Sequence, residues 1–289
     1  MNAPPPDDPR RVLARYDLRA KKSWGQNFLV ARGVHQRIVA AAGATADDVV
    51  VEIGAGLGTL TAALATAEPP PRRVIAVERD PDMLTVLRGE LGAVANIEIA
   101  AADAATFDLE SVARAAGRPV IVVGNLPYQI SSALLLRLAR AGARALARAV
   151  VMVQREMAQR VAAPAGNKIY GRFSVAMQQR AAVRILFHVS PGAFHPPPQV
   201  TSSVLELLPR ASMLAPVRDE ILFDEVVKEA FGTRRKMLRR ALAPAFGAEV
   251  AEAALHQAGI DGTLRAEALT IAQLARLADG VLAARAAAR

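Results

Sequence analysis

The sequence predicts an α/β fold, in which the strands of a mainly parallel sheet alternate with helices, followed by a small all-helical domain. Over the first part of the chain, short apolar runs suited to strands buried on both faces alternate with helical segments. A glycine-rich turn follows the first of these runs, at the position where open α/β sheets bind ligands. From about residue 210 onward the strand pattern stops, and only helical segments separated by glycines remain.

The individual elements follow from the apolar runs and from the helical period. Each predicted strand ends at a turn or a polar residue. The predicted strands are residues 49–53, 73–77, 97–100, 120–123, 149–154, 183–189 and 200–207. The predicted helices of this region are residues 33–42, 60–67, 81–91 and 130–139, with two more that begin near 155 and 170.

The composition limits the classes of function. At 289 residues the chain has room for one large domain and one small one. It has no cysteines, which excludes disulfides, thiolate metal sites and cysteine nucleophiles, and fits a cytoplasmic protein. The four histidines lack metal-ligand spacing, so we expect no metal. No apolar run approaches the roughly 20 residues that span a membrane.

The charge of the chain points to an anionic partner. The net charge of +9 indicates a polyanion, most simply nucleic acid. Residues 1–9 are rich in proline and lack the apolar core of a signal peptide, and we expect residues 1–20 to form a disordered basic tail. The cations between Arg10 and Lys22 are either phosphate contacts or charges on a solvated segment.

The glycine-rich turn, Gly54-Ala55-Gly56-Leu57-Gly58, separates the predicted strand 49–53 from the next helix. Glycines at such a turn let a ligand approach the backbone closely. The third glycine is residue 58, whereas the dinucleotide-binding fingerprint would require it at 59. Glu52 precedes the glycines, as in the Glu-x-Gly-x-Gly turn of S-adenosylmethionine (SAM) enzymes. These details favour SAM over a nicotinamide cofactor.

Two acidic residues end the next two predicted strands. Glu78 suits acceptance of hydrogen bonds from two ribose hydroxyls, although the same position binds ribose in nicotinamide enzymes. Its alternative role is that of a helix-start acid, which Asp80 before Pro81 already fills. Asp103 can accept from the amine of the cofactor's adenine, or it can cap the following segment.

The segment Asn125-Leu126-Pro127-Tyr128 follows the fourth strand. Pro127 has no backbone donor and keeps Leu126 out of the helical region, so the chain leaves the strand in an extended turn. The Asn125 side chain and the Leu126 carbonyl then offer two acceptors beside the Tyr128 ring. They suit a planar group with an exocyclic amine, such as adenine. The alternative is an ordinary strand-to-helix turn with Tyr128 packed inward.

A proline-rich loop precedes the last predicted strand. Residues 196–198 are consecutive prolines, which neither a helix nor a central strand accommodates. Phe194 therefore lies on a stiff extended loop, where a base could stack on it, and a hairpin onto the sheet would bring it near Tyr128. The alternative is a phenylalanine packed in the core.

The helical domain contains a cluster of cations in Phe231-Gly232-Thr233-Arg234-Arg235-Lys236-Met237-Leu238-Arg239-Arg240. On one helix, Arg235 and Arg239 would be i,i+4 neighbours, as would Lys236 and Arg240, with Met237 and Leu238 facing inward. Like charges at this spacing repel, which favours an anionic partner over a solvated face.

Five motifs, in this order, resemble the ribosomal RNA adenine dimethyltransferase family. They are Gly-Gln-Asn-Phe-Leu at 25–29, Glu-x-Gly-x-Gly at 52–56, Asn-Leu-Pro-Tyr at 125–128, Tyr-Gly-Arg-Phe-Ser-Val at 170–175 and Phe-x-Pro-x-Pro-x-Val-x-Ser-x-Val at 194–204. Gln129 departs from the family, which often has Asn there. The resemblance implies a Rossmann-like class I SAM-dependent methyltransferase sheet with an antiparallel last strand over residues 21–210, and a small helical RNA-binding domain over residues 211–289.

The resemblance also implies an activity: SAM-dependent dimethylation of N6 on two adjacent adenosines in a hairpin near the 3′ end of 16S rRNA. The expected partner is 16S rRNA in the immature small subunit, and we expect a monomer that contacts no membrane. The implied catalytic residues are Asn125, Leu126, Tyr128 and Phe194. The implied cofactor contacts are Asn27, Leu29, Gly54, Glu78, Asp103 and Asn125. The implied RNA contacts are Arg234, Arg235, Lys236, Arg239 and Arg240.

Three other functions remain open from the sequence. A related enzyme dimethylates one adenosine of large-subunit RNA and confers macrolide resistance. A catalytically inactive ribosome-assembly factor would use only the basic surfaces, although Asn125 and Glu78 are intact. A nicotinamide-dependent oxidoreductase is opposed by the glycine spacing and by the high pI of 10.7.

Overall fold

The computed structural model describes residues 7–21, 24–233 and 236–287. The chain forms two compact units, each assembled from two stretches of sequence. The first unit comprises residues up to 158 together with 183–209, and the second comprises 159–182 and 210–289. The predicted division at about residue 210 therefore separates the units only in part, because residues 159–182 belong to the second unit.

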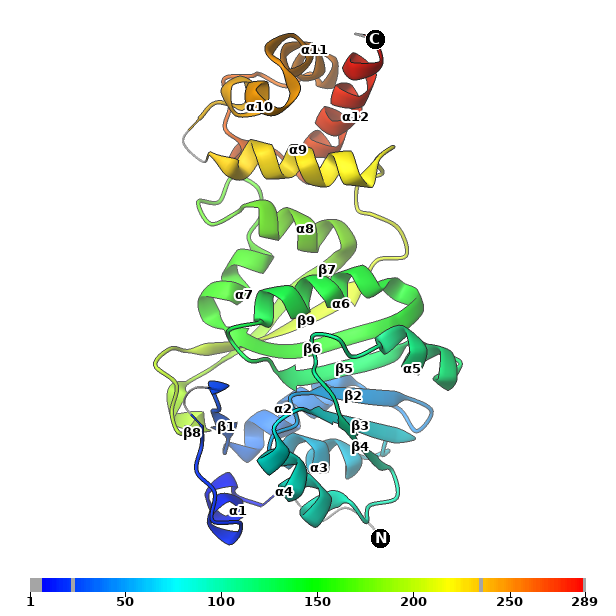
Figure 1. The fold of residues 1–289 in the computed structure, drawn as a ribbon, viewed down its shortest axis with the longest axis vertical. Helices are drawn as coiled ribbons and strands as arrows, with labels where there is room; N and C mark the ends of the chain where they lie inside the picture. Colours follow the sequence, from blue (N-terminus) through cyan, green and yellow to red (C-terminus); the bar gives the residue numbers. More distant parts are fainter. Residues whose placement is uncertain (1–6, 22–23, 234–235, 288–289) are drawn as a thin grey trace. The chain divides into compact units, whose positions relative to one another are not determined.

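A seven-stranded sheet forms the centre of the first unit (Figure 1). Its strand order is β4-β3-β2-β5-β6-β9-β7. The strands are β2 (Val49–Ile53), β3 (Arg73–Glu78), β4 (Ile97–Ala101), β5 (Val120–Asn125), β6 (Leu146–Gln154), β7 (Ala181–Val189) and β9 (Ser202–Pro209). Strands β2, β3, β4, β5 and β6 are parallel to one another, whereas β9 pairs antiparallel with β6. The predicted α/β sheet with an antiparallel last strand is confirmed.

The central strands are apolar because they are covered on both faces. All five residues of β2 are buried, as sheets with helices on both sides require. The helices of this part of the chain are α2 (Arg32–Ala42), α3 (Thr59–Ala65), α4 (Pro81–Leu91), α5 (Leu109–Ala116), α6 (Ser131–Ala145) and α7 (Arg155–Ala162). Helix α5 is additional to the predicted helices.

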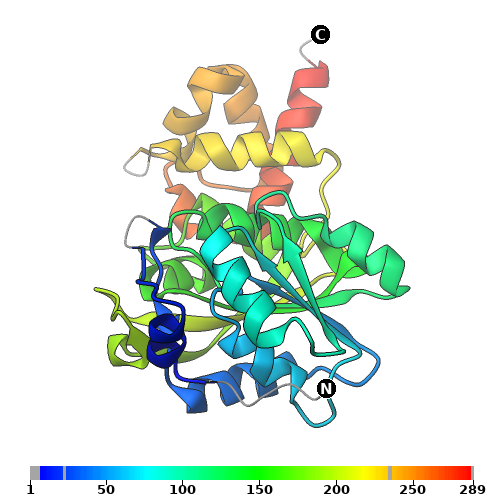
Figure 2. The same cartoon turned by 60° about the horizontal axis from the view of Figure 1, so that its bottom comes forward.

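The predicted disorder of residues 1–20 is wrong for residues 7–20, which are described. Helix α1 (Pro9–Arg15) is capped by Asp8, whose side chain accepts from Arg10 N. Helix α1 is the dark blue helix in Figure 2. Its Val12 and Leu13 are buried in one apolar cluster with Leu57 and neighbouring residues of the first unit. The sequence contained this helix's start, an aspartate before proline, but its basic composition obscured the two buried side chains.

Several cations of this segment have acidic partners within the protein. Arg10 pairs with Asp8, and Arg15 pairs with both Asp7 and Glu90. Exposed pairs of this kind add little to stability, but they reduce the charge available to phosphates. The alternative of phosphate contacts is therefore weakened at these two arginines.

The N-terminal arm, which we define as Lys21 and residues 24–29, lies beside the proline-rich loop. Strand β1 (Phe28–Leu29) pairs antiparallel with β8 (Phe194–His195), with Phe28 opposite His195 and Leu29 opposite Phe194. A short turn, Pro191–Ala193, precedes β8. Two of the motifs from opposite ends of the first unit thus form one two-stranded ribbon.

The second unit is helical. Its helices are α8 (Arg172–Arg180), α9 (Glu220–Gly232), α10 (Leu238–Phe246), α11 (Ala248–Ala258) and α12 (Ile271–Ala287), with a short turn at Ala266–Ala268. Tyr170 and Val175, from the Tyr-Gly-Arg-Phe-Ser-Val motif, are buried in the same core as Phe223 and Leu242. This packing explains why residues 159–182 join the second unit. None of the described helices is sufficiently long and apolar to cross a membrane.

Candidate active site

A cavity lies at the carboxyl ends of four neighbouring strands of the first unit. Gly54 follows β2, Glu78 ends β3, Asp103 follows β4 and Asn125 ends β5, and all four residues line the cavity. Residues 24–29 of the arm line it as well. The structure thus brings together the predicted cofactor residues at the edge where parallel sheets place their ligands.

The glycine-rich turn has a backbone that other residues rarely adopt. Gly54 and Gly56 have φ angles of 73° and 54°, in the left-handed region that favours glycine. A Cβ on Gly56 would lie 3.2 Å from the Phe28 ring of the arm. The turn therefore requires glycine both for its own conformation and for the approach of the arm.

The Glu78 carboxylate is held by three backbone amides. Its Oε1 accepts from the N–H groups of Arg79 (2.8 Å) and Asp80 (2.9 Å), and its Oε2 accepts from Gly56 N (2.9 Å). A carboxylate offers about four acceptor positions, so Oε2 retains one. The acceptance of hydrogen bonds from ribose hydroxyls stays a prediction, and Oε2 has one acceptor position left for it.

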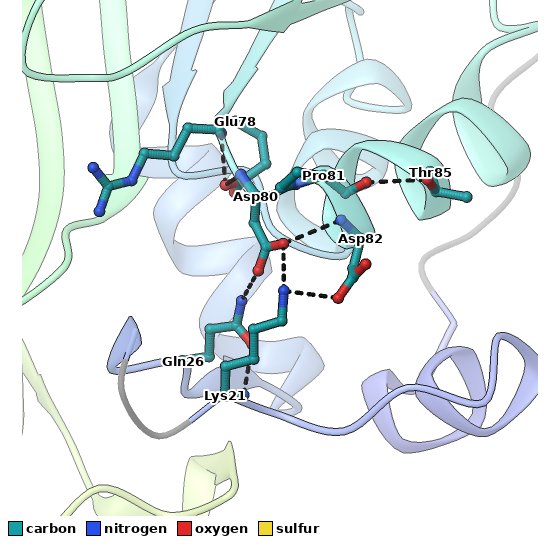
Figure 3. A network of polar contacts seen from close by, with 8 residues as sticks. Lys21, Gln26, Glu78, Asp80, Pro81, Asp82 and Thr85 are labelled. Atoms are coloured by element: carbon teal, nitrogen blue, oxygen red, sulfur yellow. Dashed lines mark hydrogen bonds and ion pairs between the residues drawn. The ribbon is translucent and has the colours of Figure 1, made fainter.

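Asp80 anchors the arm beside Glu78 (Figure 3). Its buried carboxylate contacts Lys21 Nζ at 2.7 Å and accepts from Gln26 Nε2 at 2.7 Å. Lys21 also pairs with Asp82, and the pKa of Lys21 is raised by Asp80 first and Asp82 second. The sequence indicates only a helix-start acid at Asp80, because no local pattern links residue 80 to residues 21 and 26.

Asp103 caps the segment after β4, which is one of the two roles that the sequence left open, and its acceptance from an adenine amine stays a prediction. Its Oδ1 accepts from Ala105 N (2.8 Å), as a cap does, and its Oδ2 accepts from Arg79 Nη1 (2.8 Å). Both hydrogen bonds lower the pKa of Asp103, and the bond from Ala105 has the larger effect. The carboxylate is therefore ionised. The Arg79 guanidinium also lies 5.0 Å from the centre of the Trp24 ring. Arg79 and Trp24 are additional cavity residues that the motifs did not identify.

The orientation of the Asn125 amide follows from its contact with the arm. Its Nδ2 donates to the backbone carbonyl of Asn27 at 3.1 Å. If the amide were turned round, Asn125 Oδ1 would face the Asn27 carbonyl oxygen, and two acceptors cannot form a hydrogen bond. Oδ1 therefore points away from Asn27. Oδ1 is buried and has no hydrogen-bond partner among the described residues. The site therefore contains a fixed, unused acceptor at the end of β5.

The rest of the Asn-Leu-Pro-Tyr motif is also held firmly. Leu126 N donates to Met152 O at 3.0 Å, which fixes the peptide that follows Asn125. The Tyr128 hydroxyl is 2.9 Å from Ser202 Oγ, and burial raises the pKa of Tyr128. Leu126, Pro127 and Tyr128 all line the cavity. The Tyr128 hydroxyl is thus held by Ser202, which begins β9 and belongs to the Phe194–Val204 motif.

Phe194 and Leu29 lie in the core in this structure. They are 4% and 6% exposed and belong to one apolar cluster. Leu29 lines the cavity, whereas Phe194 is not among the lining residues. In this structure Phe194 is packed in the core, as the alternative interpretation predicted. The contact from the proline-rich motif to Tyr128 is made by Ser202. Stacking of a base on Phe194 stays a prediction.

The predicted RNA contacts lie in the second unit. Arg234 and Arg235 are outside the described residues. Helix α10 begins at Leu238, so Lys236 and Arg240 are not neighbours on one helix as predicted. Leu238 is buried as expected, but Met237 is 38% exposed, which corrects the prediction that it faces inward. Lys236, Arg239 and Arg240 are exposed.

Two buried titratable residues line the cavity without having been predicted as site residues. Glu52 is 2% exposed and accepts from the Thr61 hydroxyl. Burial raises its pKa to about 8, partly opposed by Thr61 and assisted by the charge of Glu78. His35 is 3% exposed, and burial lowers its pKa to about 4. Both side chains are therefore uncharged at neutral pH.

We expect the wild-type protein to lose stability as the pH rises from about 6.5 to 8, and the Glu52→Gln variant to lose this dependence. Over this range the unfolded chain ionises Glu52, whose ordinary pKa is 4.5, whereas the folded protein keeps it protonated up to about 8. The free energy of unfolding should fall by about 1.4 kcal/mol per pH unit. Urea titrations of both proteins across this range measure the difference.

The pH window avoids the opposite contribution of His35. A histidine whose pKa is lowered to about 4 stabilises the fold above its ordinary 6.5 and loses that contribution as the pH falls below it. Glu98→Gln, a change at an exposed glutamate of β4, is the matched control and should follow the wild type. Parallel curves for the wild type and the Glu52→Gln variant would show that Glu52 is ionised in the folded protein.

Comparisons with known proteins agree with this geometry. Residues 17–281 match the family model described as Ribosomal RNA adenine dimethylase. A protein named Ribosomal RNA small subunit methyltransferase A from Anaeromyxobacter dehalogenans (strain 2CP-C) is 47% identical over 279 residues, covering 93% of this chain and 96% of that protein. Its namesake from Paramagnetospirillum magneticum is 45% identical over 271 residues, covering 93% and 92%.

Solved structures show the same fold. The crystal structure of the 23S rRNA methyltransferase ErmE is 27% identical, with a TM-score of 0.68, and covers 88% of this chain and 99% of that one. A dimethyladenosine transferase from Plasmodium falciparum has a TM-score of 0.72 at 22% identity, covering 86% and 95%. The chain belongs to the ribosomal RNA adenine dimethylase family.

Proposed function

We propose that the cavity binds SAM and that the Asn-Leu-Pro-Tyr motif presents the N6 amine of an adenosine to it for two successive methylations. Family membership makes the chain an rRNA adenine dimethyltransferase. The main support for placing the amine at Asn125 is its buried Oδ1, an acceptor that has no hydrogen-bond partner among the described residues. An exocyclic amine supplies the N–H donor that this atom lacks.

The cavity residues fit an adenosine-containing cofactor. Glu78 retains one acceptor position for a ribose hydroxyl, and Asp103 carries an ionised carboxylate that can accept from an adenine amine. The Gly54 and Gly56 backbone leaves no side chain to obstruct the approach. Asn27 and Leu29 belong to the arm that borders the same cavity. When bound, SAM supplies a methyl group on a positively charged sulfur.

The chain's contribution to the transfer is positioning and charge stabilisation. The N6 amine is a poor nucleophile because its lone pair is delocalised into the purine ring. Asn125 Oδ1 and the Leu126 carbonyl would accept its two N–H groups and favour a pyramidal nitrogen whose lone pair faces the methyl group. The same acceptors stabilise the positive charge that develops on nitrogen, and together such effects are worth several kcal/mol.

No general base is required in this scheme. The alkylated nitrogen is cationic and acidic, so its proton can pass to water. Tyr128, whose hydroxyl is held by Ser202, would stack on the extruded base, a contact worth about 1–3 kcal/mol. For the second methylation one N–H remains, and one of the two acceptors holds it.

The proposed substrate is 16S rRNA in the immature small subunit, at two adjacent adenosines of a hairpin near its 3′ end. Relatives that are 45–47% identical are named small-subunit methyltransferases, whereas the 23S rRNA methyltransferase ErmE is 27% identical. This difference favours the small-subunit substrate over the large-subunit one. We also propose that the chain acts in the cytoplasm as a monomer, and that the exposed cations Lys236, Arg239 and Arg240 contribute to RNA binding.

Primer extension on small-subunit rRNA tests the assignment. We expect the purified protein, given SAM and unmethylated small subunits, to create two adjacent stops near the 3′ end of 16S rRNA, because dimethyladenosine halts reverse transcriptase. Unmethylated large subunits serve as the control substrate. Stops that appear only in 23S rRNA would assign the chain to the large-subunit enzymes, and the absence of stops in both RNAs would indicate a catalytically inactive assembly factor.

A further inference from the structure

His35 and Glu52 line the cavity but have no part in the proposed transfer step. His35 lies on α2 and Glu52 on β2, and both side chains meet the first turn of α3. His35 Nε2 is 3.3 Å from Thr59 Oγ1, and Glu52 Oε2 accepts from Thr61 Oγ1. A buried base and a buried acid therefore contact hydroxyl groups only two residues apart on one helix.

The other titratable side chains that line the cavity already have partners. Glu78 accepts from three backbone amides, Arg79 and Asp103 pair with each other, and Tyr128 contacts Ser202. His35 differs, because its Nδ1 is buried and has no hydrogen-bond partner among the described residues. Burial of a ring nitrogen without a hydrogen-bond partner is unfavourable unless a ligand binds it.

The chemistry of this pair matches a zwitterion. Desolvation favours the neutral forms of His35 and Glu52, so the two side chains carry no charge that would repel either end of a dipolar ligand. A bound carboxylate would favour the protonated imidazole, and a bound ammonium would favour the ionised Glu52. The α-amino-acid group is the common biological ligand that presents both charges within one residue's length.

We propose that His35 binds the carboxylate of the cofactor's amino-acid end, with the neighbouring ammonium directed toward Glu52. The inference rests on the proposed function, since the amino-acid end in question is that of SAM. It makes His35 a specificity-determining residue of the cofactor site, which distinguishes cofactors that retain the amino-acid group from adenosine derivatives that lack it.

The charged residues near His35 indicate the sign of the ligand that it would bind. His35 also lines a second cavity, whose charged lining residues are Asp7, Asp8, Arg11 and Arg32. Asp7 and Asp8 are paired with Arg15 and Arg10. Arg11 and Arg32 add positive potential near the imidazole, which favours an anionic ligand.

Calorimetric binding of two ligands to the full-length protein tests the proposal. S-Adenosylhomocysteine carries the amino-acid end, and 5′-methylthioadenosine lacks it. We expect His35→Leu to raise the Kd of S-adenosylhomocysteine by about tenfold or more, since a charge-assisted hydrogen bond is lost, and to leave the Kd of 5′-methylthioadenosine within about twofold. His35→Gln, which retains a donor, should recover part of the affinity, and His256→Leu in the second unit is the matched control.

Proton uptake gives a second measurement that a purely structural role would not change. Titrations at about pH 6 in two buffers of different ionisation enthalpy should show that the wild type takes up more protons on binding S-adenosylhomocysteine than His35→Leu does. Equal losses for the two ligands, or none for either, would overturn the role of His35 while leaving the cofactor assignment intact. Failure of the wild type to bind either ligand would instead refute the proposed function.

Discussion

The Asn125→Ala variant is expected to retain SAM binding and to lose methyl transfer by about 100- to 1,000-fold. Oδ1 of Asn125 is the buried acceptor without a partner among the described residues, and removing one fixed group that stabilises developing charge costs a factor of this size. The rate is measured as transfer of labelled methyl groups from SAM to unmethylated small subunits. The Kd of SAM is measured by calorimetry on the same preparations.

The cofactor measurement is needed because Asn125 has a second contact. Its Nδ2 donates to the Asn27 carbonyl of the arm at 3.1 Å, so the substitution also releases one attachment of the arm. The attachments of Lys21 and Gln26 to Asp80 remain, and we therefore expect SAM affinity to change by less than about tenfold. Asn167→Ala, at an exposed asparagine of the second unit, is the matched control. A turnover rate close to that of the wild type would remove Asn125 from the mechanism.

The Gly124→Ala variant is expected to be destabilised by about 3 kcal/mol, near the upper end for overpacking in a rigid core. A Cβ on Gly124 would lie 2.4 Å from the Ile53 carbonyl oxygen of the neighbouring strand. This atom belongs to the backbone of β2, which is hydrogen-bonded between β3 and β5 and cannot move alone. Chemical denaturation measures the loss of stability.

The same clash should weaken the cofactor site, because Ile53 precedes Gly54 and Gly124 precedes Asn125. Gly33→Ala is the matched control, since no heavy atom lies within 4 Å of a Cβ added there. Gly33 is in helix α2, where alanine is favoured over glycine by up to about 1 kcal/mol. Equal stabilities for the two alanine variants would mean that the ends of β2 and β5 are more adaptable than their packing indicates.

Much of the fold followed from local patterns. The apolar runs that predicted strands 49–53, 73–77 and 97–100 correspond to β2, β3 and β4 within one residue at each end. Such runs are informative because a strand covered on both faces must be apolar throughout. The acidic and amide residues that end these strands could be placed at one edge, because parallel strands direct their carboxyl ends to the same side.

Other features could not follow from local patterns. The disorder predicted for residues 7–20 was wrong because two buried side chains, Val12 and Leu13, outweigh a basic composition. Helix α10 begins at Leu238, which separates Lys236 from the helix that was predicted to carry it. In both cases the deciding energy is the burial of particular apolar side chains against distant parts of the chain.

Residue type and spacing along one element were enough to predict the α/β class, the glycine turn and the acceptors at Asn125. The direction of the Asn125 amide depends on folding, because the Asn27 carbonyl that orients it comes from the arm. Folding also brings Lys21 and Gln26 to Asp80, and it buries His35, uncharged, beside the glycine turn. Hydrogen bonding and desolvation depend on groups that meet only after folding, so no local pattern records them.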